Sequence, residues 1–110
     1  MEWIEVHWTS KDLKEAQRIT RLLVEKRYVA CAQIIPQIES IYFWQGQLQK
    51  AHESKVLLKT SQAHFAAIQQ IIEQNCSYEV PEITWVALGG GNPGYLDWLA
   101  KAHSPLKKRT

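Results

Sequence analysis

The side chains with the clearest chemical potential lie in two short segments of the chain. Residues 76–83 carry a thiol at Cys76 and carboxylates at Glu79 and Glu82, spaced around a proline. Residues 91–99 begin with Gly-Asn-Pro-Gly and continue with large aromatic side chains. The carboxylates either line a polar cleft or are solvated beside a turn. The glycine-rich start could offer N–H groups to an anion, but it lacks the Lys-Ser/Thr of a phosphate loop, so a tight turn with a helix cap is the preferred interpretation.

A metal site would draw on the soft ligands of the chain, because copper favours thiolate and imidazole. These ligands are Cys31, Cys76, His7, His52, His64 and His103. None is paired at His-x-x-x-His or Cys-x-x-Cys spacing, so a site has to be assembled from distant segments or between subunits. No Cys-His or Ser-His-Asp set emerges either, and we therefore expect the protein not to be an enzyme. Both cysteines are expected to be reduced, with Cys31 packed in the core between two alanines.

Composition bounds the size and the partners of the protein. A chain of 110 residues with 45% hydrophobic content is long enough for one core. We expect one domain over residues 1–104, followed by a basic tail at 105–110. The formal charge is +2, and because the tail is basic the body is nearly neutral, so neither nucleic acid nor a membrane is an expected partner. The chain shows no signal-like start and no apolar run of about 18 residues, so we expect a cytoplasmic protein.

The elements that must position these groups follow from the spacing of apolar residues. Alternation over residues 3–8 predicts a half-buried strand whose even-numbered side chains share one face. Apolar positions at helical spacing predict an amphipathic helix over residues 11–26, with Thr9 or Ser10 as its N-cap.

A long hairpin is predicted next. Residues 28–35 and 38–44 are strand-like, and Pro36 between them predicts a bulge, because proline cannot donate to the ladder. The Gln-Gly pair at 45–46 predicts a tight turn into a second strand over residues 47–60.

The second half of the chain predicts two helices around one strand. Ser61 is the N-cap candidate of a helix that ends near Asn75. Residues 82–88 are rich in Ile, Thr, Trp and Val and predict a strand. After three glycines, Asn92 is a suitable N-cap and Pro93 a suitable first residue for a third helix.

The order β-α-β-β-α-β, then α, predicts an α+β fold of the ferredoxin-like type. Its sheet would be antiparallel, with the first two helices on one face. The opposite face still carries apolar residues, which either the third helix or another copy of the chain must cover. The hairpin also carries Tyr42, Phe43 and Trp44 beyond the reach of the helices. We therefore predict an oligomer with the hairpin tip in the contact.

Several segments together resemble the CutA divalent-cation tolerance family. They are 28–36 (Tyr-Val-Ala-Cys-Ala-Gln-Ile-Ile-Pro), 40–46 (Ser-Ile-Tyr-Phe-Trp-Gln-Gly), 58–60 (Leu-Lys-Thr), 78–82 (Tyr-Glu-Val-Pro-Glu) and 91–99 (Gly-Asn-Pro-Gly-Tyr-Leu-Asp-Trp-Leu). In this order and spacing they extend the resemblance over nearly the whole chain. It implies a ferredoxin-like subunit of a tight homotrimer, with a role in tolerance of or response to divalent metals, copper above all, and no established reaction.

The resemblance also implies where a metal would bind. Cys76 stands where many members of the family have a His-Pro pair before the tyrosine, so it keeps a soft ligand there, with Glu79 nearby as an oxygen donor. Where some members have a cysteine at the end of the first strand, this chain has Trp8, which cannot coordinate a metal. Copper or another divalent metal is thus the expected ligand, with no organic cofactor.

An alternative function follows from the similarity of the family to PII signalling trimers, which bind small ligands in clefts between subunits. On that alternative the ligand is a metabolite or a nucleotide. The residues expected to line the cleft are Glu79, Glu82, Asn92 and Tyr95. The residues expected at the subunit interface are Tyr42, Phe43, Trp44 and Trp98.

A third class, a small enzyme or an RNA binder, is compatible with the fold alone. RNA binding is disfavoured because the chain lacks the alternating aromatic and basic strand pattern of an RNA-recognition sheet.

Overall fold

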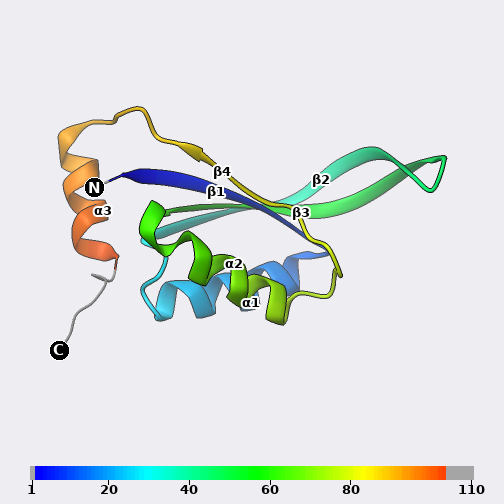
Figure 1. Cartoon of the computed structure of the whole chain (residues 1–110), viewed down its shortest axis with the longest axis horizontal. Helices are drawn as coiled ribbons and strands as arrows, with labels where there is room; N and C mark the ends of the chain where they lie inside the picture. The colour runs from blue at the N-terminus through cyan, green and yellow to red at the C-terminus, as the bar shows by residue number, and fades with distance from the viewer. Residues whose placement is uncertain (1, 104–110) are drawn as a thin grey trace.

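The structure, a computed structural model, describes residues 2–103, so the predicted basic tail at 105–110 lies outside the described residues. In chain order the elements are β1 (Trp3–Ser10), α1 (Leu13–Glu25), β2 (Cys31–Trp44), β3 (Gln47–Ser61), the short 3-10 helix η1 (Gln62–His64), α2 (Phe65–Asn75), β4 (Ile83–Ala87) and α3 (Pro93–Ala102). The strands form one antiparallel sheet in the order β2-β3-β1-β4 (Figure 1). The predicted ferredoxin-like α+β fold with an added C-terminal helix is therefore confirmed. Within the described range, no helix has the length and apolarity needed to span a membrane.

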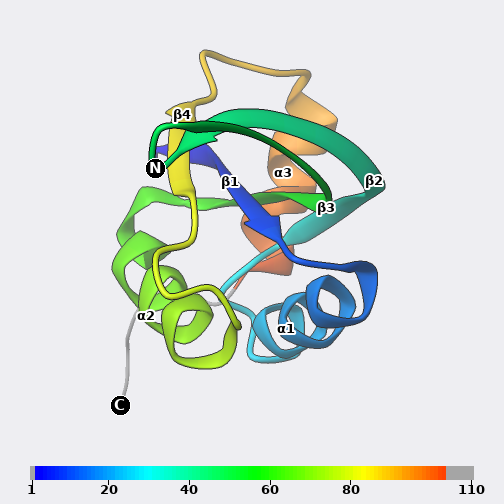
Figure 2. The same ribbon diagram turned by 90° about the vertical axis from the view of Figure 1, so that its right-hand side faces the viewer.

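Side-chain alternation along the central strands decides which face of the sheet becomes the core. In β1, Ile4, Val6 and Trp8 are fully buried, and the neighbouring strand β3 adds Val56 and Leu58. Helices α1 and α2 lie side by side against this face and cover it (Figure 2). Because burying each such side chain stabilises the fold by about 1.5–3 kcal/mol, the alternation that predicts the strand also determines the order of the layers.

The caps of the first two helices differ from those predicted, whereas Asn92 and Pro93 begin α3 as predicted. Thr9 and Ser10 do not cap α1, because both still pair with β3 as part of β1. The N-cap is Asp12, whose side chain accepts a hydrogen bond from the backbone N–H of Glu15 (2.9 Å). Ser61 ends β3 and is the N-cap residue of the short helix η1, without a side-chain capping bond, whereas the N-cap of α2 is His64.

Strands β2 and β3 form the predicted long hairpin. Their register shifts once, between Ile35 and Ile38, so the bulge lies at Pro36 as predicted. The Ser54 hydroxyl donates to the Pro36 carbonyl (2.7 Å) and satisfies that acceptor. At the tip, Gln45 and Gly46 have φ values of 52° and 79°, the left-handed conformations that a two-residue hairpin turn requires. The hairpin reaches well past the helices, and the molecule is 49 Å long (Figure 1).

The face of the sheet opposite α1 and α2 combines polar contacts with exposed apolar side chains. Lys59 Nζ lies 3.0 Å from Gln33 Oε1 and 3.5 Å from Glu5 Oε1, so one cation links three strands. By the strand register, Ile35 and Val86 lie on this same face, and both are exposed. The uncovered apolar surface that the sequence predicts is therefore present in a single copy of the chain.

Glu15 ties the start of α1 to two other segments. Its carboxylate is buried and accepts hydrogen bonds from the Ser10 hydroxyl and the Ser77 backbone N–H, both at 2.8 Å. A longer bond comes from the Lys11 N–H (3.4 Å). Burial alone would raise the pKa of Glu15, but these hydrogen bonds outweigh it and hold the pKa below its ordinary value. The charged carboxylate thus connects β1, α1 and the loop after α2.

Replacing Glu15 with glutamine should lower the free energy of unfolding by about 2 kcal/mol at neutral pH, because the hydrogen bonds to the buried acceptor lose their charge. Since the folded-state pKa is lowered, the carboxylate's contribution is complete above the ordinary value of 4.5 and is lost as the pH falls through the folded-state pKa. Urea unfolding of wild type and Glu15→Gln should therefore converge in acid. Glu25→Gln, at the exposed end of the same helix, is the matched control. A difference between wild type and Glu15→Gln that stays constant into acid would contradict this role.

Candidate functional site

The loop after α2 holds the thiol that the sequence analysis singled out. Cys76 is half-buried at the C-cap of α2, and its thiol donates a hydrogen bond to the Tyr78 carbonyl (3.4 Å). Burial is the main reason that the pKa of Cys76 is raised, and the nearby Glu15 carboxylate acts in the same direction. At neutral pH the side chain is therefore a thiol, which must release a proton before it can bind a metal.

Tyr78 anchors this loop to the base of the hairpin. Its hydroxyl donates a hydrogen bond to Glu53 on β3 (2.6 Å). Burial and then this bond to a carboxylate raise the pKa of Tyr78, so the phenol remains protonated. Glu15 binds the amide of Ser77 one residue earlier, so two adjacent residues at the start of the loop are held from α1 and from β3.

The two carboxylates of the loop have different surroundings. Glu79 is exposed to solvent. Glu82 accepts hydrogen bonds from the hydroxyls of Thr9 (2.9 Å) and Thr84 (3.3 Å), and Lys55 Nζ lies 3.7 Å away. Glu82 is therefore engaged in linking β1, β3 and β4 within its own chain, whereas the carboxylate of Glu79 faces outward.

The donors of one copy do not complete a metal centre. Across residues 2–103, no three or more His, Cys, Asp or Glu side chains are grouped so that they could hold a metal ion. Cys76 and Glu79 supply one soft and one hard ligand. Trp8 lies fully buried in the core and contributes none. A centre at Cys76 would need further ligands from outside the described part of this copy.

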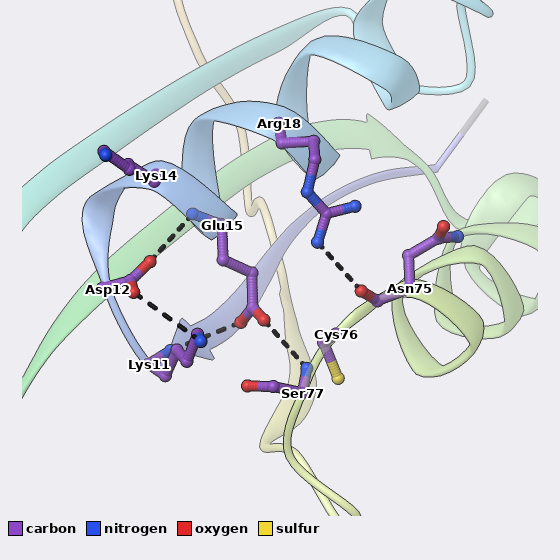
Figure 3. A pocket seen from close by; sticks show the side chains of 8 residues that line it. All are labelled: Lys11, Asp12, Lys14, Glu15, Arg18, Asn75, Cys76 and Ser77. Carbon is purple, nitrogen blue, oxygen red and sulfur yellow. Dashed lines mark hydrogen bonds and ion pairs between the residues drawn. The ribbon is translucent and has the colours of Figure 1, made fainter.

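A cavity of about 410 Å³ lies where the start of α1 meets the end of α2 (Figure 3). It is lined by Lys11, Asp12, Lys14, Glu15, Arg18, Asn75, Cys76 and Ser77. Both carboxylates accept backbone hydrogen bonds, and the Arg18 guanidinium donates to the Asn75 carbonyl (3.1 Å). Lys11 Nζ lies 3.9 Å from Asp12 Oδ2, and the lining has three basic against two acidic side chains. Its excess of one positive charge favours an anion over a metal cation. The sequence analysis missed the cavity, because its two halves come from distant segments; the capping-box spacing of Asp12 and Glu15 marks only the start of α1.

The other two residues predicted for a cleft lie at the far end of β4. Asn92 is exposed at the N-cap of α3, where its carbonyl accepts two N–H groups of the first turn but its side chain makes no capping bond. Tyr95 stacks on Trp98 with ring centroids 5.7 Å apart. Burial and a contact with the Cys31 thiol raise the pKa of Tyr95. Cys31, expected in the core, is instead half-buried on the open face beside Tyr95.

One copy therefore does not bring the predicted cleft residues together. The two carboxylates precede β4 and the other two residues follow it, so the length of that strand separates the pairs (Figure 1). The predicted interface residues are likewise divided between the two ends of the molecule. Tyr42, Phe43 and Trp44 are exposed at the hairpin tip, and Trp98 is 49% exposed on α3.

Known proteins of one family share both the sequence and the fold. A family profile described as CutA1 divalent ion tolerance protein matches residues 4–102. The chain is 39% identical over 84 residues to the divalent-cation tolerance protein CutA of Thermus thermophilus, covering 76% of this chain and 82% of that protein. It is 37% identical over 91 residues to mouse Protein CutA, covering 83% of this chain and 51% of that protein. The chain thus spans about half the length of the curated relatives from mouse and rice.

The same relationship appears in three dimensions. The crystal structure of CutA1 from rice, Oryza sativa, matches with a TM-score of 0.92 at 30% identity, covering 96% of each chain. The fold, the matched profile and the relatives agree with the segments that carry the resemblance in the sequence. The chain belongs to the CutA1 divalent ion tolerance protein family.

Proposed function

We propose that the chain is the subunit of a non-enzymatic homotrimer that acts in tolerance of divalent metal ions, with copper as its principal ligand. Family membership supports metal tolerance as the general role. The observation that supports the homotrimer is the exposed apolar surface of the hairpin. The observation that favours binding over catalysis is the chemical state of Cys76.

The hairpin tip presents a cluster of exposed large apolar side chains, here called the hairpin patch. Its members are Ile41, Tyr42, Phe43, Trp44 and Leu48. Phe43 is 74% exposed, and it pairs across the ribbon with Leu48, which is 67% exposed. Clustered exposed side chains of this kind mark contact sites, and covering one of them contributes about 1.5–3 kcal/mol.

A second copy of the chain is the partner that suits this patch. The sheet has two unlike edges, the long β2 and the short β4. A contact between unlike edges of neighbouring copies is heterologous, and heterologous contacts close into rings when the rotation permits. Strand addition would also satisfy the backbone groups that an edge strand leaves unpaired. A ring of three copies is the closure that the family resemblance implies.

Cys76 supports binding rather than catalysis. A catalytic cysteine is activated by a lowered pKa and a neighbouring base. Here burial raises the pKa of Cys76, and its thiol donates to a backbone carbonyl instead of to a base. In the proposed role Cys76 is a soft ligand for copper, Glu79 is an accessory oxygen donor, and a neighbouring copy completes the coordination.

Replacing Trp44 with alanine should weaken the assembly. A large aromatic side chain in a contact contributes about 2 kcal/mol, which corresponds to a rise of roughly 30-fold in the dissociation constant. Sedimentation velocity over a dilution series measures this change. Gln47→Ala is the matched control, because Gln47 is exposed and lies directly opposite Trp44. Identical profiles of wild type and Trp44→Ala at every dilution would count against the hairpin patch as an interface.

Replacing Cys76 with serine should reduce the amount of Cu(I) bound per subunit under reducing conditions by at least about half, because the thiolate is the softest ligand available. Binding by wild type should strengthen as the pH rises, since the raised pKa makes the metal compete with a proton. Cys31→Ser, which removes the other thiol, is the control and should bind as wild type does. Equal uptake by wild type and Cys76→Ser would remove Cys76 from the site.

A second candidate function, a PII-like trimer that binds a small anionic metabolite or nucleotide, is favoured by the basic cavity beside Cys76. Native mass spectrometry of the protein taken directly from lysate distinguishes the two functions, because it reports the subunit count and the retained ligands together. Metal tolerance predicts trimers that carry metal. The PII-like function predicts trimers that carry an organic anion, and the anion should be lost in Lys14→Ala. Trimers carrying metal alone would contradict the PII-like function, and single subunits would contradict both.

A further inference from the structure

Four rings from distant parts of the chain form a row beside the start of β1, here called the aromatic row: Tyr28, His64, His103 and Trp3. The ring centroids of Tyr28 and His64 are 5.5 Å apart, and those of His64 and His103 are 5.2 Å apart. The His103 and Trp3 rings meet edge-on at 5.1 Å. The row joins the loop after α1, η1, the end of α3 and β1, and Figure 1 shows α3 beside the start of β1.

The two imidazoles at the centre of the row are buried and oriented by backbone carbonyls. His64 is 1% exposed and His103 is 5% exposed. Nδ1 of His64 donates to the Tyr28 carbonyl (3.1 Å), and Nδ1 of His103 donates to the Ala100 carbonyl (3.2 Å). Because a carbonyl oxygen only accepts, the proton of each neutral ring is on Nδ1 and the unprotonated nitrogen is Nε2.

The surroundings of His64 oppose a positive charge. Among residues 2–103, no carboxylate is one of the groups that shift the pKa of His64. Burial is the main cause that lowers the pKa of His64; the bond to Tyr28 opposes it, and His103 adds to the lowering. Two charged side chains of the elements that meet here have other partners. Glu5 contacts His7 and Lys59, and Arg27 donates to the Lys101 carbonyl. The other charged side chains nearby are exposed to solvent: Glu2, Asp97 and Lys101.

The end of α3 is held by the aromatic row and by two further contacts. Leu99 is fully buried, and the Arg27 guanidinium donates to the Lys101 carbonyl (3.0 Å). Neither of these contacts changes between about pH 5 and pH 8, whereas an imidazole does. Of these three interactions, the aromatic row is the one whose charge such a change of pH can alter.

We propose that the aromatic row is a pH-dependent latch, in which protonation of His64 in acid releases the end of α3 from η1 and β1. The sign follows from the lowered pKa: the neutral ring's contribution is complete above 6.5 and is lost as the pH falls from there toward the folded-state value. Release would also loosen Tyr95 from the open face of the sheet. The latch operates within one copy and does not depend on how the copies assemble.

Hydrogen exchange of the wild-type protein tests the latch directly. Protection factors, corrected for the intrinsic pH dependence of exchange, are measured at about pH 7.5 and about pH 5. We expect the amides in the last turns of α3 to lose at least about tenfold in protection, while those of β1 and β3 keep theirs. Unchanged protection of α3, or an equal loss throughout the sheet, would overturn the proposal.

Variants separate the latch from a general effect of acid. In His64→Asn, an amide N–H replaces Nδ1–H as the donor to the Tyr28 carbonyl but does not titrate, so α3 should keep its protection at low pH. The control is His52→Asn, which removes an exposed histidine of the hairpin and should behave as wild type does. Loss of α3 protection in His64→Asn equal to that of wild type would overturn the latch.

A second measurement needs no variant. The imidazole resonances of His64 in the wild-type protein and the amide resonances of α3 are followed by NMR through the same pH titration. The latch requires a shared midpoint for the ring and the helix. A helix whose resonances shift at a midpoint different from that of His64 would exclude this ring as the trigger.

Discussion

The alternation of side chains along β1 sets the two faces of the sheet, and the other layers follow from it. β1 lies between β3 and β4, and its even-numbered side chains are wholly buried against α1 and α2. A shift of one residue would move Trp8 to the open face and Glu5 into the core, so the register is strongly specified. The burial has one cost, because the indole N–H of Trp8 is buried without a partner in the described chain.

The two ends of this sheet differ in how much of their surface is covered. At one end the hairpin extends past the helices and presents apolar side chains to solvent. At the other end α3 lies beside the start of β1 and covers part of the open face through Tyr95. A single copy thus has a self-contained core, and it exposes large apolar side chains outside that core.

The loop between α2 and β4 concentrates the chemistry. Glu15 on α1 holds Ser77 and Glu53 on β3 holds Tyr78, so the two residues that directly follow Cys76 are fixed in place. The same burial that positions the thiol also raises its pKa, so the proposed metal binding there would be coupled to proton release. The aromatic row is a second, separate place where burial of a titratable group couples structure to pH.

Local sequence patterns were sufficient to predict the layers of the fold and the hairpin with its bulge at Pro36. They were also sufficient to identify the family. Periodicity reports which side of an element is buried, and proline or a Gln-Gly pair reports local backbone geometry. The cap of α1 was predicted wrongly because Ser10 and Asp12 are both suitable caps, and the choice depends on how far β1 pairs with β3. The cavity beside Cys76 and the row from Tyr28 to Trp3 could not be predicted, since each joins residues far apart in the chain. Such groups meet only after the backbone has folded, and no local spacing encodes their distance.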